Sequence, residues 1–313
     1  MTEPAPVVLF TYSRIDHTKK TVEALKENTL APRTKLYIVS DGARGDADME
    51  AVQAVREYCR TVSGFAEVRL ICRKKNFGLG RNIISGLNHI FTKYDRAIIL
   101  EDDIVTSPMF LSFMNLALDR YKDNTEVMSV SGYVSPFDKT DVPDFFFSYW
   151  FECWGWATWK DRWKKFERDP GKLILNTGRK EKRYINVNGT SPDMWDQVID
   201  NYQGHRYTWA IFNHITICRE RGLVLYPKYS YCKNIGFDGT GDNCDASDEY
   251  ETELFGMEKE DIRMPDEIKV SEEAVRNFEE FNKNRNRKRG LLWNVRVRLK
   301  SFMFSFFGRL FLN

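Results

Sequence analysis

The stretch RAIILEDDI, residues 96–104, decides how the rest of this 313-residue chain is interpreted. Four apolar residues run directly into three carboxylates, which is typical of a buried strand that ends abruptly at the carboxyl edge of a parallel sheet. Ligands of open α/β sheets bind just beyond that edge. Three adjacent acids repel one another, so we expect a cation there, most simply a divalent metal ion that also holds substrate phosphates. The alternative is a solvated acidic turn ahead of a helix that begins near Ser107-Pro108.

Strand-like and helix-like stretches alternate around this segment, up to about residue 121. The expected strands are 6–10, 35–40, 68–72 and 98–100, and the expected helices are 15–28, 49–61, 79–93 and 109–121. This alternation predicts an α/β fold in which helices flank a mostly parallel, Rossmann-like sheet.

The alternation stops after residue 130. Further strands are expected at 143–150 and 223–226, and further helices at 193–203, 208–220 and 271–283. We predict one catalytic domain over residues 1–270, with a nucleotide-binding half (1–130) and an acceptor half (131–270). Residues 271–313 are expected to form basic amphipathic helices appended to it.

Charge is distributed unevenly along the chain. Residues 281–313 hold nine Lys and Arg and no acid, which leaves 38 bases against 45 acids in residues 1–280. This balance argues against a nucleic-acid binder and for a local basic contact surface. None of the six cysteines forms a C-x-x-C pair, no secretory leader is recognisable, and the longest apolar tract (302–312) is too short to span a bilayer. We therefore predict a reduced, cytoplasmic setting, with three disulfides as the alternative for the six cysteines.

Polar residues follow each of the first four expected strands. Arg14 follows the first, Asp41 the second, Asn76 with its basic neighbours the third, and the acidic triplet the fourth. Parallel strands bring these ends to one edge of the sheet, where Arg and Lys suit phosphates and an Asp can accept from a base or a ribose. Asn76 also opens the glycine-containing loop NFGLGRN, which precedes a helix but matches neither a P-loop nor a full dinucleotide fingerprint.

The order of these motifs resembles nucleotide-sugar glycosyltransferases of the GT-A fold. Arg14, Asp41, the Glu101-Asp102-Asp103 triplet, Trp154-Gly155-Trp156 and Trp195-Asp196 follow one another as they do in the Golgi enzymes that add N-acetylglucosamine to mannose of N-glycans. Bacterial polysaccharide glycosyltransferases share this layout. The likeness covers about residues 6–242 and implies an inverting enzyme that uses a UDP-sugar.

The resemblance also implies a role for each matching residue. Asp103 would bind Mn²⁺ or Mg²⁺, Glu101 and Asp102 would contact the ribose or the waters of the metal, and Asp41 would hold the uracil. Asp196 would be the general base, although its acid could also simply complement the start of a helix. The full set of expected donor contacts is Thr11, Tyr12, Arg14, Asp41, Asn76, Gly78, Arg81, Glu101 and Asp102.

Four tryptophans lie between positions 150 and 159. We expect Trp150 and Trp159 in the core and Trp154 and Trp156, together with Trp195, against the saccharide acceptor. A wholly buried aromatic core is the alternative for the cluster. The loop at 236–241 is interpreted as a lid over the donor or as a plain surface turn.

The basic tail leads into a sequence with one apolar helical side, which predicts a helix lying in an anionic membrane surface; a core or dimer helix is the alternative. The prediction is thus a peripheral enzyme on the cytoplasmic face of the membrane that glycosylates a saccharide or lipid-linked saccharide in polysaccharide synthesis. A metal-dependent sugar nucleotidyltransferase and a non-catalytic carbohydrate-binding protein are the rival interpretations.

Overall fold

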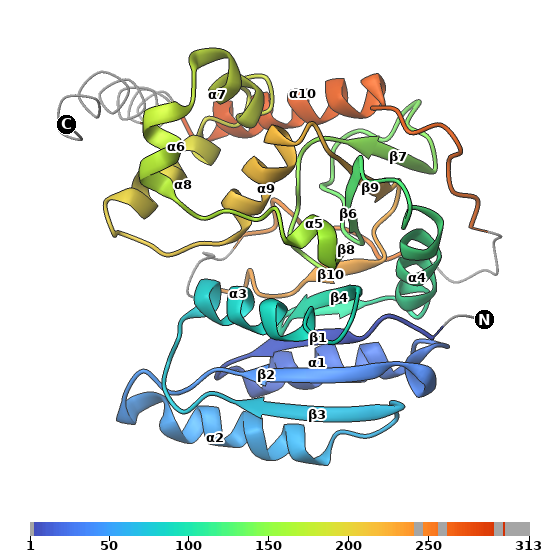
Figure 1. Cartoon of the computed structure of the whole chain (residues 1–313), viewed down its shortest axis with the longest axis vertical. Coiled ribbons are helices and arrows are strands. Elements are labelled where there is room, and N and C mark those ends of the chain that lie inside the picture. Colours follow the sequence, from blue (N-terminus) through green and yellow to red (C-terminus); the bar gives the residue numbers. More distant parts are fainter. Residues whose placement is uncertain (1–2, 241–246, 256–261, 291–296, 298–313) are drawn as a thin grey trace.

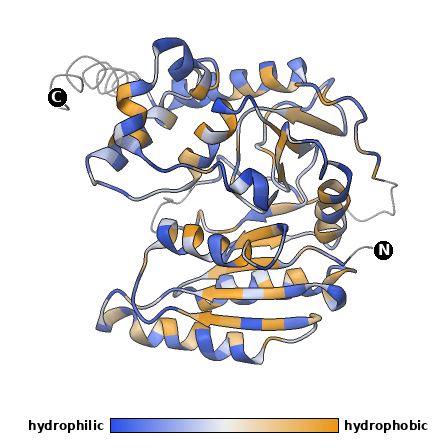
Figure 2. Cartoon of the chain, viewed as in Figure 1, coloured by the Kyte–Doolittle hydropathy of each residue, from blue (hydrophilic) through white to orange (hydrophobic). Residues whose placement is uncertain are grey.

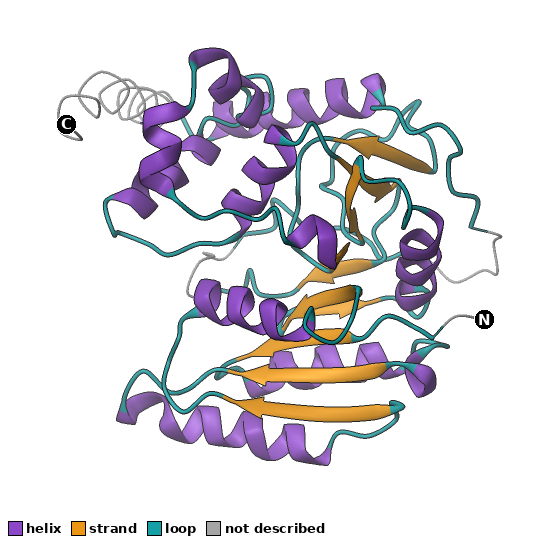
Figure 3. Ribbon diagram, viewed as in Figure 1, coloured by secondary structure: helices purple, strands orange, loops and turns teal. Residues whose placement is uncertain are grey.

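One sheet of eight strands runs through the molecule, and helices cover both of its faces (Figures 1 and 3). The computed structural model describes residues 3–240, 247–255, 262–290 and 297. The strand order is β3-β2-β1-β4-β8-β6-β9-β7, and β5 and β10 form a separate two-stranded ribbon. The strands are β1 (Val7–Thr11), β2 (Lys35–Ser40), β3 (Glu67–Cys72), β4 (Arg96–Glu101), β5 (Ile104–Thr106), β6 (Val127–Ser131), β7 (Phe145–Ser148), β8 (Trp156–Trp159), β9 (Leu223–Pro227) and β10 (Cys232–Asn234).

The first half of the sheet is parallel, as the sequence predicts. β1 lies between β2 and β4 and pairs with both in parallel, and β2 pairs in parallel with β3. Beyond β4 the sheet is mixed, because β8 is antiparallel to its neighbours β4 and β6. The predicted α/β class is confirmed, and the carboxyl ends of β1, β2, β3 and β4 meet at one edge.

Alternating side chains of the strands divide the core into two layers. Val7 and Leu9 pack with α1, α2 and α4 on one face, whereas Val8 and Phe10 pack with α3 and α9 on the other. Figure 2 shows the apolar strands between helices whose outer sides are hydrophilic. The helices are α1 (Ile15–Lys26), α2 (Asp46–Thr61), α3 (Leu79–Ile90), α4 (Phe110–Arg120), α5 (Lys160–Trp163), α6 (Pro170–Asn176), α7 (Arg179–Ile185), α8 (Asp193–Tyr202), α9 (Ala210–Arg219) and α10 (Glu272–Lys288), with a 3-10 turn at Ala31–Arg33.

Helix α10 packs against the same hydrophobic core as the rest of the domain. Phe278 of α10 is 5% exposed and stacks on Trp150 with ring centroids 4.2 Å apart. Val270, just ahead of α10, bridges to Phe147 of β7. The appendage predicted to begin at residue 271 therefore packs on the domain over residues 271–290, and the tail prediction for 291–313 lies outside the described residues except at position 297.

Two further findings bear on the setting of the protein. The five cysteines within the described ranges are free thiols. Among the helices described, none combines the length and the apolar character that a membrane-spanning segment needs.

Candidate functional site

The three carboxylates lie where β4 ends and the β5–β10 ribbon begins. Glu101 is the last residue of β4, and Asp102 and Asp103 form the turn into β5. The hydroxyl of Thr21 on α1 donates to the carbonyl of Asp102 at 2.8 Å, and the amide of Ile235 donates to the carbonyl of Asp103 at 2.9 Å. The turn is therefore fixed from two sides and continues into a strand. Asp102 is only 5% exposed, which argues against the alternative of a solvated acidic turn ahead of a helix.

Arg14, between β1 and α1, bridges the two aspartates of this turn. Its Nη2 donates to Oδ1 of Asp102 at 2.5 Å and to Oδ2 of Asp103 at 2.7 Å. Burial lowers the pKa of Arg14, but the two carboxylates outweigh this effect and hold its pKa above the usual value. A cation that offsets the acids is thus supplied by the chain itself.

One guanidinium does not balance three acids. Burial, with the charges of Asp103 and Asp102, raises the pKa of Glu101 to about 8. Burial and Asp103 also raise the pKa of Asp102 to about 6, although Arg14 lowers it. Such raised values mark a site whose negative charge is only partly compensated, and a second cation would be stabilised there.

The residue against Asp103 is a glycine at the start of the loop that the sequence suggests as a lid. Gly236 is buried, and a Cβ built on it would overlap the Asp103 carboxylate. Its amide donates to Oδ1 of Asn234 at 2.6 Å. Two residues further on, Oδ2 of Asp238 lies 3.1 Å from Nε2 of His17 on α1. The described part of the loop therefore runs from the acids to α1.

Asp41, at the end of β2, orders the glycine loop ahead of α3. It is 4% exposed, and its Oδ1 accepts from the amides of Gly42 and Phe77, both at 2.9 Å. Its Oδ2 accepts from the amide of Gly78 at 2.9 Å and from Nδ2 of Asn76 at 3.3 Å. Four donors match the acceptor capacity of a carboxylate. The contact with uracil stays a prediction and requires that one of these bonds be exchanged.

Three more of the expected donor contacts come to the same edge. Among the described residues the hydroxyl of Thr11 has no hydrogen-bond partner, whereas Tyr12 and Arg81 have partners of their own. Thr11 is buried at the end of β1, and the hydroxyl of Tyr12 donates to Oδ2 of Asp48 at 2.5 Å. Arg81 is exposed on the first turn of α3, with its guanidinium 4.1 Å from the ring centroid of Tyr207. Their contacts with a donor remain predictions.

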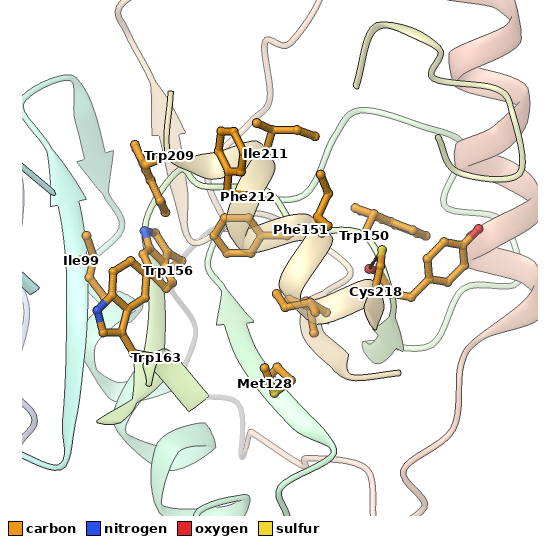
Figure 4. Packing of buried hydrophobic residues seen from close by; sticks show 14 of the residues in the cluster. Ile99, Met128, Trp150, Phe151, Trp156, Trp163, Trp209, Ile211, Phe212 and Cys218 are labelled. Carbon is orange, nitrogen blue, oxygen red and sulfur yellow. Dashed lines mark hydrogen bonds between the residues drawn. The ribbon is translucent and has the colours of Figure 1, made fainter. Parts of the chain in front are cut away.

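Two of the tryptophans expected to contact an acceptor lie in the core instead. Trp156 on β8 is 1% exposed and stacks on Trp209 at 5.2 Å, beside Trp163 (Figure 4). Trp195 on α8 is also 1% exposed. Because neither ring presents a face to solvent, the acceptor role assigned to Trp156 and Trp195 is corrected to core packing. Trp150 and Trp159 are buried as expected.

Trp154 differs from the other members of the cluster because it is only partly buried. Its ring lies edge-on to those of Tyr133, Phe237 and Tyr250, with centroids 4.6, 5.3 and 5.5 Å away. Phe237 directly follows Gly236, so this aromatic group lies next to the acid turn. Sequence reasoning missed Tyr250, because no spacing links it to residues more than 90 positions earlier.

Asp196, the predicted base, lies in the first turn of α8. Three residues earlier in the same turn, Asp193 binds Nη2 of Arg285 at 3.4 Å and Nη1 of Arg289 at 3.3 Å. Nη1 of Arg285 in turn donates to the hydroxyl of Tyr250 at 2.7 Å. A chain of contacts thus links the start of α8 to the aromatic group, whereas the catalytic role of Asp196 stays a prediction.

Within the described ranges, no three His, Cys, Asp or Glu side chains are grouped so that they alone could hold a metal ion. The residues present nonetheless suit a hard divalent cation. Asp103 offers carboxylate oxygen beside a glycine backbone, and Arg14 holds a positive charge on the same oxygen atom. Mg²⁺-type ions are commonly bound through one or two carboxylates, with the remaining ligands from water and substrate phosphates.

No protein-family model matches the sequence, and no curated protein sequence matches it. Among solved structures, the chain is similar to the mannosyltransferase PcManGT from Pyrobaculum calidifontis, in complex with GDP-Man and Mn²⁺, at 12% identity and a TM-score of 0.42 over 70% of each chain. It is also similar to S. aureus TarS at 12% identity and a TM-score of 0.31, over 41% of this chain and only 21% of TarS. At this distance, the function has to be argued from the residues of the chain itself.

Proposed function

We propose that the chain is a metal-dependent glycosyltransferase that moves a sugar from a nucleotide-sugar to a hydroxyl of a saccharide or lipid-linked saccharide. The observation that carries this proposal is the bridge from Arg14 to Asp102 and Asp103 at the carboxyl edge of the sheet. This edge holds more acids than bases, and its arginine can exchange a carboxylate partner for a phosphate. Such an edge suits a diphosphate that binds together with a divalent cation. The order of motifs along the sequence supports the same activity.

Asp103 is the residue that would hold Mn²⁺ or Mg²⁺, with Glu101 and Asp102 beside it. When bound, the ion supplies Lewis-acid stabilisation of the charge on the leaving diphosphate. Arg14 could then exchange a carboxylate for a phosphate oxygen, since a guanidinium forms charge-assisted hydrogen bonds with both kinds of oxyanion. Gly236 leaves space at Asp103 that any larger residue would fill.

The chain's other residues would bind and orient the two substrates. Asp41 keeps the glycine loop in place for the nucleotide, which we propose is UDP. Trp154 offers a partly exposed indole for the apolar face of a sugar. Asp196 would accept the proton of the acceptor hydroxyl as that oxygen attacks the anomeric carbon from the far side, so the configuration inverts and no covalent intermediate forms.

We further propose a role in surface polysaccharide synthesis at the cytoplasmic face of the membrane. The support is the concentration of nine basic residues and no acid in residues 281–313.

Thermal unfolding with UDP, GDP and their sugar conjugates, each with Mn²⁺ or with EDTA, tests the central proposal. Ligand at a hundred times its Kd stabilises the folded state by about 2.7 kcal/mol, which raises Tm by several degrees. We expect this rise with UDP and Mn²⁺, and we expect Asp103→Asn to remove it. Asp144→Asn, an exposed acid ahead of β7, is the matched control and should respond like the wild type. Absence of any nucleotide-dependent rise in the wild type would contradict the proposal.

A further inference from the structure

Two arginines share the ring of one tyrosine near the glycine loop. The guanidinium of Arg81 lies 4.1 Å from the ring centroid of Tyr207, and that of Arg168 lies 3.4 Å from it. Arg81 comes from the first turn of α3, Arg168 from the segment between α5 and α6, and Tyr207 from the loop between α8 and α9. We call these three residues the arginine cluster; it joins the two predicted halves of the domain.

The arginine cluster concentrates positive charge without a matching acid. Over the ranges that the structure describes, neither Arg81 nor Arg168 has a carboxylate within 4.0 Å. Burial lowers the pKa of Arg168, Tyr207 raises it, and the neighbouring charge of Arg81 lowers it further. Like charges held together raise the free energy of the protein until an anion binds between or beside them. Arg81 and Tyr207 are both exposed, so an anion can reach them.

The arginine cluster is fixed in place by hydrogen bonds and close backbone packing. Nε of Arg168 donates to the carbonyl of Thr208 at 2.9 Å, and its Nη2 donates to Oδ1 of Asn201 at 2.5 Å. The side chain of Tyr207 also hydrogen-bonds to Arg168. A Cβ on Gly80 would lie 2.7 Å from the carbonyl oxygen of Tyr207, so glycine lets this loop dock on α3. A guanidinium held as that of Arg168 is binds an oxyanion with less loss of side-chain freedom than a mobile one would.

We infer that the arginine cluster binds a phosphate group carried by the sugar acceptor. Guanidinium groups form charge-assisted hydrogen bonds with phosphate oxygens, and two positive charges match the charge of a phosphate. The donor diphosphate already has Arg14 and the acid turn. The arginine cluster is instead bonded to α8 through Asn201, which lies five residues, or about 7.5 Å along the helix, from Asp196. The acceptor assignment rests on the proposed function, since only a transferase has an acceptor to position.

The test is the line broadening of inorganic phosphate in ³¹P NMR by the full-length protein with EDTA present. We expect Arg81→Gln to weaken phosphate binding about tenfold, because it removes charge-assisted hydrogen bonds from an exposed side chain. Arg168→Gln should weaken it similarly, although this variant also loses the bonds to Asn201 and Thr208. Arg60→Gln is the matched control: it removes an exposed arginine at the end of α2, at the opposite edge of the sheet, and should bind phosphate like the wild type.

Broadening by Arg81→Gln equal to that by the wild type would overturn the inference. Loss of binding in Arg14→Gln with full binding in Arg81→Gln would overturn it too, because phosphate would then bind at the acid turn.

A second measurement, the Tm rise with UDP and Mn²⁺, separates the acceptor from the donor. We expect Arg168→Gln to keep the full rise, because Arg168 is not among the expected donor contacts. A smaller rise in Arg168→Gln would place the arginine cluster in the donor site and overturn the acceptor role. If the wild type binds phosphate through the arginine cluster but shows no rise with UDP, the proposed function fails; the phosphate site then stands and its acceptor role falls.

Discussion

Gly236 lies close against Asp103 in the candidate site, with no room for a Cβ between them. The glycine backbone lies against the carboxylate that would bind the metal, and Arg14 contacts the same oxygen atom, Oδ2. The space beside Asp103 therefore depends on one missing methyl group. Side chains that carry the chemistry can be recognised in the sequence, but a residue that matters because it lacks a side chain is recognised only from its neighbours in space.

We predict that Gly236→Ala abolishes the Tm rise with UDP and Mn²⁺. The added Cβ would overlap the carboxylate of Asp103 and displace it from its place beside Arg14. Gly178→Ala is the matched control, because a Cβ at that position meets nothing within 4 Å and its φ of −78° suits alanine. Equal responses of the two variants to UDP and Mn²⁺ would show that Gly236 does not shape the site. Far-UV circular dichroism of both proteins checks that they fold.

The burial of one histidine makes the stability of the protein depend on pH. His214 on α9 is 2% exposed, and burial lowers the pKa of its imidazole from 6.5 to about 4, although the bond to the carbonyl of Ile185 opposes this. The unfolded chain therefore binds the proton more tightly than the folded one. The contribution of His214 is complete above the unfolded pKa and is lost as pH falls toward the folded value.

We predict that the free energy of unfolding falls by about 2 kcal/mol more in the wild type than in His214→Gln between pH 7 and pH 5. Glutamine can still donate to Ile185 but does not titrate. Urea unfolding of both proteins at the two pH values measures the difference. An identical loss of stability in the two proteins would mean that His214 does not carry this pH dependence.

At the scale of elements, α10 is held by aromatic stacking. Phe278 is 5% exposed, stacks on Trp150 and lies edge-on to Phe137 at 5.8 Å. We predict that Phe278→Ala lowers the free energy of unfolding by about 3–5 kcal/mol, the range for a deleted core phenylalanine. Arg276→Ala, with a 71% exposed side chain on the same helix, should change it by less than about 0.5 kcal/mol. Denaturant unfolding distinguishes this from an α10 docked only loosely, for which the two variants would be equally stable.

The sequence predicts the first four strands well because each is a short apolar run followed by polar residues. β2 is predicted with its bounds correct, and β1, β3 and β4 within two residues at each end. The elements β5, β6, β8 and β10 are not predicted. Three of them, β5, β8 and β10, have only three or four residues, which carry too little periodicity and depend on distant partners. β8 also lies within the tryptophan cluster, where the spacing of four tryptophans among ten residues does not show which rings point into the core.

The same limit applies to the candidate site. The sequence places Arg14 and the three acids at one edge, and the structure brings Arg14 into contact with Asp102 and Asp103. The sequence does not indicate that the carboxylate of Asp41 is surrounded by four hydrogen-bond donors. Nor does it indicate that Arg168 and Arg81 both contact the ring of Tyr207. These contacts are made by loops that lie far apart in the sequence and come together only in the folded protein.

At the scale of the whole molecule, the basic C-terminal segment is partly engaged by the domain. Arg285 and Arg289 bind Asp193 at the start of α8, and Arg289 also approaches Glu249 at 3.7 Å. These two cations are therefore less available to a membrane than the sequence alone implies. The basic residues beyond position 290 remain as the expected source of membrane attraction.

We predict that the intact protein co-sediments with vesicles containing phosphatidylserine and that exchange of Arg296, Arg298, Lys300 and Arg309 for glutamine greatly weakens this. Each basic residue near an anionic surface contributes about 1 kcal/mol, so four together change the partition coefficient on the order of a thousandfold. The substitutions spare every ion pair between α10 and α8. Vesicles of phosphatidylcholine alone are the control and should bind neither protein. If the fourfold variant sediments with anionic vesicles as well as the wild type does, the tail acts through its apolar side chains or not at all, because loss of its charge would then leave the attraction unchanged.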